Sequence, residues 1–275
     1  MSLQLSVDNK DVSIVIRRFP AGETFIKIDA EAVEHQPSFA EITLEFEGND
    51  DLFNLALLVD AVRRELGHDI LIELQMPYLP YARQDRVCAR GESLSVKVAC
   101  DFINGLKFSA VQCFNIHSDV GVALLDNLMH VDSKFDFLGM SHHANRQTIL
   151  VSPDAGANKK VLAIAKEYGY ANVVRADKTR DVLSGKITGT VVYSEPVGDK
   201  DFLIVDDICD GGRTFTELAK ELRKLTTGKV MLYVTHGIFS AGEKVFDGLV
   251  DSLYTSNPVG ATGKAAVASG KVVVV

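Results

Sequence analysis

The sequence contains no tryptophan, and its 275 residues include only four cysteines and seven prolines. The cysteines form no Cys-x-x-Cys pair and show no zinc-like spacing to histidine, so we expect free thiols at Cys88, Cys100, Cys113 and Cys209. No apolar run reaches the ~18–20 residues that cross a bilayer, and the N-terminus lacks a signal-peptide hydrophobic region. We therefore expect a cytoplasmic protein that does not enter a membrane.

An excess of positive charge is also absent. The chain has 29 basic and 37 acidic residues, giving a net charge of −8, whereas a general nucleic-acid binder carries a basic face. Hydrophobic residues make up 47% and charged residues 24%, as in ordinary globular proteins. The charge still permits a local basic pocket for a phosphorylated small molecule.

Short apolar strands alternate with amphipathic helices, and the pattern repeats past residue 140. Such alternation is typical of parallel sheets, so the sequence predicts an α/β fold with two similar domains, 1–140 and 141–275. Each should be a mainly parallel sheet flanked by helices, with the boundary between 138 and 147. Expected strands lie at 12–19, 41–48, 109–117, 148–154, 171–177, 188–194, 201–207 and 229–239, an apolar run lies at 70–81, and expected helices lie at 51–66, 93–106, 158–169 and 214–225.

The segment FLIVDDICDGGRTFTELAKELRKL has the features of a sugar-phosphate site. We expect the strand Phe202–Val205 to end at Asp206 and Asp207, because ligands of α/β sheets bind beyond the carboxyl ends of strands. The turn Asp210–Thr214 then leads into a helix, whose N-terminus and glycines favour a phosphate. The two acids suit sugar hydroxyls or a cation that bridges to them. An ordinary solvated turn is the alternative, but it would rarely combine all these features.

The start of that helix also suggests a capping box. Thr214 and Glu217 have the required spacing, so we expect Thr214 to cap the helix.

This segment resembles the phosphoribosyl-pyrophosphate motif of type I phosphoribosyltransferases and of ribose-phosphate pyrophosphokinases, and it does not choose between them. Four further segments, in family order over most of the chain, are similar to the second family: FPAGE (19–23), MPYLPYARQDR (76–86), VSPDAG (151–156) and THGIFS (235–240). The resemblance implies two type I phosphoribosyltransferase-like domains. The first would bind ATP and form the oligomer, and the second would bind ribose phosphate.

The resemblance also implies functions for individual residues. Taken singly, each has a plainer reading; Asp154, for example, could cap the helix that follows it. Taken together, in family order, the residues favour the functional interpretation. Lys178 and Arg180 would be the catalytic cations; Phe19, Glu23, Arg83, Gln84 and His117 would contact ATP; His117 and Asp154 would bind Mg²⁺; Asp206 and Asp207 would hold the ribose; and Asp210, Gly211, Gly212, Arg213 and Thr214 would surround the 5-phosphate.

The implied reaction transfers the β,γ-pyrophosphoryl group of ATP to the C1 hydroxyl of ribose 5-phosphate, with Mg²⁺, and releases AMP. The resemblance further implies a homo-oligomer, a dimer or hexamer, whose subunits share the ATP site. A phosphoribosyltransferase and a noncatalytic regulatory homologue are the alternatives.

Several positions depart from the family pattern. The phosphate turn commonly reads Asp-Thr-Gly-Gly-Thr, but here Gly211 lacks a hydroxyl and Arg213 replaces a glycine at a position that could require positive φ. Asn115 replaces an aspartate before His117, and Ala21 replaces an Asn or Asp. Ribose 5-phosphate is the first acceptor predicted. A 5-substituted ribose such as ADP-ribose, as in NAD salvage, is the alternative, with Arg213 reaching its diphosphate.

Overall fold

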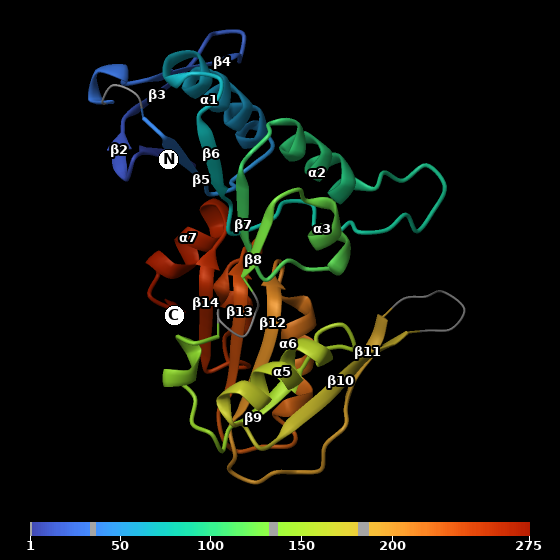
Figure 1. Cartoon of the computed structure of the whole chain (residues 1–275). Coiled ribbons are helices and arrows are strands. Elements are labelled where there is room, and N and C mark those ends of the chain that lie inside the picture. The colour runs from blue at the N-terminus through green and yellow to red at the C-terminus, as the bar shows by residue number, and fades with distance from the viewer. Residues whose placement is uncertain (1, 34–36, 132–136, 181–186) are drawn as a thin grey trace. The chain divides into compact units, whose positions relative to one another are not determined.

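A computed structural model describes residues 2–33, 37–131, 137–180 and 187–275, without the side chains of 178–180 and 187–188 (Figure 1). The chain divides into two compact units, Met1–Val131 and Asp132–Val275. The division predicted from the sequence was placed after residue 140. No helix within the described ranges is long and apolar enough to cross a membrane.

Unit 1 is built on a six-stranded sheet of order β2-β1-β5-β6-β7-β8. Strands β5 to β8 are parallel, and β1 and β2 add an antiparallel edge. A separate antiparallel hairpin, β3–β4, forms a second small sheet. The strands are β1 (Leu3–Val7), β2 (Lys10–Val12), β3 (Ile14–Arg18), β4 (Thr24–Ile28), β5 (Phe39–Leu44), β6 (Leu71–Gln75), β7 (Ala110–Phe114) and β8 (Leu128–Val131).

Alternate strand residues of unit 1, such as Ile42, Ile72 and Val111, enter one core together with the apolar residues of the helices. Helix α1 begins with two acids and ends with two arginines, which suits the helix dipole, and Gly67 at φ 104° ends it. Each fully buried aliphatic side chain stabilises the fold by about 1.5–3 kcal/mol. The helices are α1 (Asp50–Leu66), α2 (Ser95–Gly105) and α3 (Asp119–Leu124), with a short 3-10 helix η1 (Ala30–Ala32).

Unit 2 has a seven-stranded sheet of order β11-β10-β9-β12-β13-β14-β15. All neighbouring strands are parallel except β10 and β11, which form an antiparallel ribbon. The strands are β9 (Ile149–Ser152), β10 (Val173–Arg180), β11 (Ile187–Val192), β12 (Phe202–Cys209), β13 (Val230–Gly237), β14 (Ser252–Pro258) and β15 (Val272–Val274).

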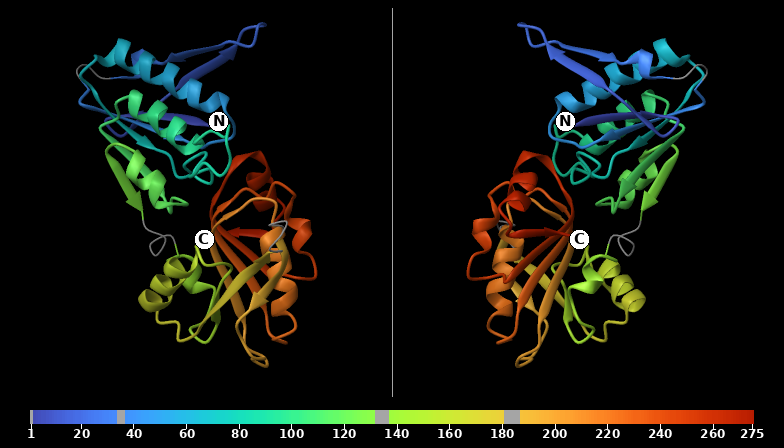
Figure 2. Two further views of the ribbon diagram at one scale, coloured as in Figure 1. Left: turned by 90° about the vertical axis from the view of Figure 1, so that its right-hand side faces the viewer. Right: turned by 90° about the vertical axis from the view of Figure 1, so that its left-hand side faces the viewer.

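Helices cover both faces of this sheet, as Figure 2 shows. One core joins α5 (Asn158–Tyr168) to the side chains of Leu203 and Val205. The other core joins α6 (Arg213–Leu222) to Phe202 and Ile204. The other helices among the described residues of unit 2 are α7 (Gly260–Ala268) and the 3-10 helices η2 (Met140–His142) and η3 (Glu243–Phe246).

The predicted α/β class, with mainly parallel sheets flanked by helices, is confirmed in both units. Within the described residues the four cysteines form no disulfide; Cys88 is exposed, and Cys100, Cys113 and Cys209 are buried. Several predicted strand ends differ from the structure, and the one that affects the site is the end of the apolar strand predicted at Phe202–Val205. Strand β12 continues to Cys209, so Asp206 and Asp207 lie within it rather than after it.

Candidate functional site

The strand order of unit 2 reverses between β9 and β12, where ligands of open α/β sheets bind. Strand β12 pairs with β9 only over Phe202–Ile204. Beyond that point β12 keeps β13 on one side, while β9 ends at Ser152 and gives way to a loop. The edge of β12 from Val205 onward therefore faces the loop that carries Asp154.

Two acids lie on this part of β12. Successive strand residues point to opposite faces, and Asp207 points toward α5, where Lys160 Nζ lies 3.8 Å from its Oδ2 atom. Asp207 is only 7% exposed, so the Lys160 ammonium lies near a carboxylate that is largely removed from solvent. The backbone N–H of Asp207 donates to the carboxylate of Asp206 at 2.9 Å.

The surroundings of Asp206 disfavour the charged form of its carboxyl group. Burial raises its pKa well above the usual range, and the negative charges of Asp207 and Asp154 raise it further. The three acids thus form one interacting group at the carboxyl end of the sheet. Such a group binds hydroxyl hydrogens or a cation and repels a bare phosphate.

Asp154 also organises its own loop. Its Oδ1 accepts hydrogen bonds from the backbone N–H groups of Gly156 at 3.0 Å and Ala157 at 3.2 Å. These bonds form a turn just before α5 begins at Asn158. Asp154 therefore has the structural function of a helix-preceding turn, and its metal-binding function stays a prediction.

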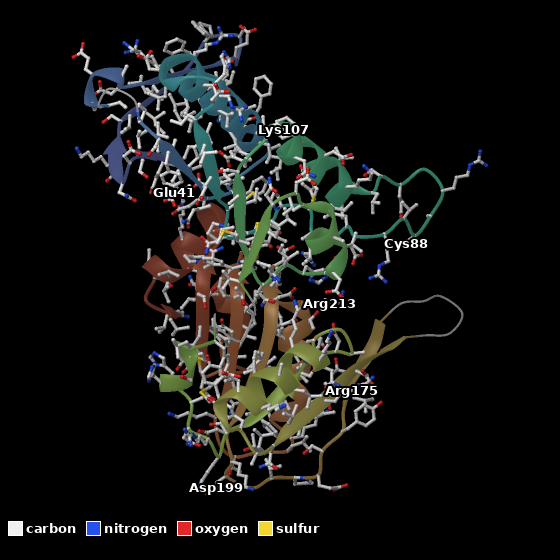
Figure 3. All side chains as sticks on the ribbon, in the orientation of Figure 1. Glu41, Cys88, Lys107, Arg175, Asp199 and Arg213 are labelled. Carbon is white, nitrogen blue, oxygen red and sulfur yellow. The ribbon has the colours of Figure 1, made fainter. Side chains whose placement is uncertain are left out.

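The turn after β12 has the geometry of a phosphate cradle. Gly212 adopts φ 77°, and α6 begins at Arg213. Within the described ranges, the backbone N–H groups of residues 211–214 donate no hydrogen bond. These amides converge at a helix N-terminus, which favours an anion. Arg213 lies exposed at this end of α6, as Figure 3 shows.

Two predictions about this turn were wrong. The helix has no side-chain cap, and Thr214 lies inside its first turn rather than before it, so no capping box forms. Glu217 instead pairs with Lys220 at 2.9 Å. The position with positive φ is Gly212, so Arg213 occupies an ordinary helical position without strain.

The predicted catalytic cations lie on the ribbon β10–β11. The backbones of Lys178 and Arg180 belong to the last residues of β10 and pair with Thr190 and Ile187. Strand β10 therefore reaches both positions, and its register with β11 shifts between Thr179 and Arg180. Their side chains lie outside the described residues.

In unit 1, three of the residues predicted to bind ATP, Arg83, Gln84 and His117, lie on the loops that follow β6 and β7. Arg83 and Gln84 lie exposed in the loop after β6. Next to them, Asp85 accepts two hydrogen bonds from Arg86, at 2.8 and 3.2 Å. The Arg86 guanidinium lowers the pKa of Asp85, and burial opposes this shift. The nearby Ser118 hydroxyl and His117 ring, on the loop after β7, lower the pKa of Asp85 as well.

Phe19 and Glu23 lie at the tip of the β3–β4 hairpin. The N–H of Phe19 donates to the carbonyl of Glu23 at 2.8 Å and closes the turn. Phe19 is 54% exposed and meets Phe25 edge to face, so Phe19 is not a core residue. The tip borders a hollow of about 460 Å³ whose other wall includes Phe53 on α1. An exposed ring beside such a hollow suits stacking on a flat base.

The structure thus brings together Asp154, Asp206 and Asp207 in unit 2, and Asp85 with His117 in unit 1. Sequence reasoning missed Lys160 and Asp85. Lys160 could have been found from the sequence, because it is the third residue of the helix after VSPDAG. A lysine in this first turn lies near the carboxyl ends of the strands. No cluster of three or more metal-binding side chains occurs among the described residues.

The fold defines an α/β protein in which acidic side chains and a helix N-terminus lie at the switch point of a mainly parallel sheet. Residues 3–106 match the family described as the N-terminal domain of ribose phosphate pyrophosphokinase. The chain is 31% identical to the ribose-phosphate pyrophosphokinase of Mycoplasma genitalium over 257 residues, covering 90% of this chain and 75% of that protein. It is 28% identical to that of Campylobacter jejuni, covering 94% of this chain and 82% of that protein.

The chain therefore belongs to the ribose-phosphate pyrophosphokinase family. The crystal structure of phosphoribosylpyrophosphate synthetase from Mycobacterium smegmatis has the same fold, with a TM-score of 0.79 and 21% sequence identity. That match covers 98% of this chain and 87% of the other. It confirms the predicted pair of type I phosphoribosyltransferase-like folds.

Proposed function

We propose that this protein transfers the β,γ-pyrophosphoryl group of ATP to the C1 hydroxyl of ribose 5-phosphate, giving phosphoribosyl pyrophosphate and AMP. The chain belongs to this family, and one observation carries the proposal. The backbone N–H groups of residues 211–214, which follow the acids of β12, donate no hydrogen bond within the described residues and could bind a phosphate. We place the reaction in the cytoplasm.

The turn at residues 211–214 and the acids of β12 bind different parts of the acceptor. The amides and the N-terminus of α6 bind the 5-phosphate, and Arg213 adds a cation beside it. Asp206 and Asp207 accept hydrogen bonds from the ribose hydroxyls, so the sugar is fixed at both ends. Fixing the acceptor contributes to catalysis, because phosphoryl transfer depends largely on positioning and charge neutralisation.

The donor is held by the residues of unit 1. The exposed guanidinium of Arg83 suits bidentate binding of a phosphate, with Gln84 and His117 beside it. Phe19 stacks on adenine, and Glu23 accepts a hydrogen bond from it. Both residues come from a neighbouring subunit of a dimer or hexamer. Lys178 and Arg180 stabilise the charge that develops on the transferred group.

Magnesium fits the donor set of the site. The carboxylate of Asp154, with the acids of β12, supplies the hard oxygen ligands that Mg²⁺ prefers. Mg²⁺ is usually held by one or two carboxylates together with substrate phosphates, so these carboxylates need not form a complete ligand set. Bound there, Mg²⁺ would neutralise charge on the phosphates of ATP.

A 5-substituted ribose such as ADP-ribose is the second candidate acceptor. The observation that favours it is the open outer side of the turn: Gly211 is exposed, and a Cβ built on it meets only Ser240 Oγ, at 3.9 Å. Arg213 is exposed beside this opening and suits a diphosphate.

The test is AMP release from ATP and Mg²⁺ with ribose 5-phosphate or ADP-ribose as acceptor. We expect AMP and a sugar 1-pyrophosphate with ribose 5-phosphate. Turnover confined to ADP-ribose would support the second candidate. A phosphoribosyltransferase would ignore ATP and consume phosphoribosyl pyrophosphate with a base, and a regulatory homologue would release no AMP with either acceptor.

A further inference from the structure

The loop that follows β13 is bonded directly to the phosphate turn after β12. The backbone N–H groups of Ile238 and Phe239 both donate to the carbonyl of Cys209, at 2.8 and 3.1 Å. The N–H of Ser240 donates to the carbonyl of Asp210 at 3.2 Å. Three main-chain bonds therefore join the loop to the start of the turn.

A side-chain bond extends this connection to the acid of the turn. The hydroxyl of Ser240 donates to the Asp210 carboxylate with an oxygen–oxygen distance of 2.5 Å. Hydrogen bonds to ionised acceptors are short and about twice as strong as neutral ones. The carboxylate of Asp210 therefore has one preferred orientation before any ligand binds.

Aromatic side chains pack against the glycine of the turn. Phe246 is 2% exposed, and a Cβ built on Gly212 would lie 2.7 Å from its ring. Phe246 meets Phe239 edge to face at 6.3 Å. Phe239 is 1% exposed and adopts φ 48°, an unfavourable conformation for a large side chain that its burial offsets.

We propose that Ser240 is a positioning residue for the acceptor site, which fixes Asp210 while Phe239 and Phe246 support Gly212. The proposal rests on the proposed function of the turn as the 5-phosphate site. Because Ser240 orients the turn in advance, less ordering remains to be done when the acceptor binds. The effect belongs to acceptor binding and leaves ATP binding unchanged.

The test compares Ser240→Ala with Ser240→Thr, which keeps the hydroxyl. We expect Ser240→Ala to raise the KM for the acceptor about fivefold to tenfold, with kcat and the KM for ATP near wild type. Ser240→Thr should restore most of the acceptor KM. The matched control is Ser269→Ala, which removes a hydroxyl bonded to the Ala266 carbonyl at 2.7 Å, away from the turn.

A double-mutant cycle on binding separates positioning from general stability. The dissociation constant of ribose 5-phosphate is measured by calorimetry for Ser240→Ala, Asp210→Asn and the double variant. If Ser240 acts through Asp210, adding Ser240→Ala to Asp210→Asn has little further effect. Additive losses, equal rises in both KM values, or an effect no larger than that of Ser269→Ala would overturn the proposal.

These outcomes are distinct from failure of the proposed function. Wild-type protein that binds ribose 5-phosphate but never forms AMP would refute the proposed reaction. The calorimetric cycle would still decide whether Ser240 acts through Asp210. Wild-type protein that neither binds ribose 5-phosphate nor forms AMP would refute both.

Discussion

The ammonium of Lys160 lies 3.8 Å from the buried carboxylate of Asp207 and connects α5 to the acids of β12. We predict that Lys160→Met weakens acceptor binding, because Asp207 loses the cation that orients it. Lys160 is 33% exposed, so solvent screening limits the effect to about 1 kcal/mol, or roughly fivefold in the acceptor KM. The neighbouring exposed residue supplies the control: Lys159→Met should leave the acceptor KM unchanged. Equal effects of the two variants would show that only net charge matters.

The glycines of the phosphate turn provide a matched pair. At Gly212, an alanine would combine φ 77° with a Cβ 2.7 Å from Phe246, so Gly212→Ala should cost ~2 kcal/mol or more of stability and raise the acceptor KM. At Gly211 the φ is not positive and the nearest atom lies at 3.9 Å, so Gly211→Ala should fold like wild type. Thermal unfolding and acceptor kinetics check both variants. Equal tolerance of the two substitutions would contradict the geometry.

The pKa of Asp206 leads to a prediction about stability and pH. Because this pKa is raised in the folded protein, the folded state holds its proton more tightly than the unfolded chain does. Ionisation of Asp206 therefore destabilises the fold as pH rises from the ordinary carboxyl range through the raised pKa. In metal-free buffer, Asp206→Asn should raise the melting temperature at neutral pH, and the gain should shrink toward acidic pH. A gain that grows on acidification would have the wrong sign.

Arg83 tests the donor side. We predict that Arg83→Lys raises the KM for ATP about tenfold, because lysine cannot bind a phosphate with two parallel hydrogen bonds. The acceptor KM should stay near wild type. Arg90→Lys, on the same exposed segment, is the control and should change neither value. If both variants behave alike, Arg83 contributes only general positive charge.

The regular helices and strands could be predicted from sequence, because the spacing of apolar residues along one element is a local feature. Helix α1 was expected at 51–66 and occupies Asp50–Leu66, and α5 was expected at 158–169 and occupies Asn158–Tyr168. Strand β1 and helix α7 were not predicted. Strand β1 is stabilised by antiparallel pairing with β5, a distant partner. In α7 the apolar residues surround the helix, so no one-sided pattern appears in the sequence.

Motif reading found the residues of the site but not their geometry. The acids of β12 and the glycine turn were predicted, yet the strand was ended too early, because Ile208 and Cys209 follow two charged residues that interrupt the apolar run. The contribution of Lys160 depends on where α5 packs, which sequence spacing alone does not determine. The sequence also did not show that Gly212, rather than Arg213, has positive φ, nor that the ring of Phe246, 34 residues further along the chain, leaves no room for a Cβ there.

The most direct test follows the β-phosphorus of ATP. Purified protein is incubated with Mg²⁺, ribose 5-phosphate and ATP radiolabelled at the β-phosphorus, and the products are separated by chromatography. The account predicts that the label moves to the pentose as a 1-pyrophosphate, with AMP formed in equal amount. Label retained in ADP, or ATP left intact with every ribose phosphate supplied, would contradict it.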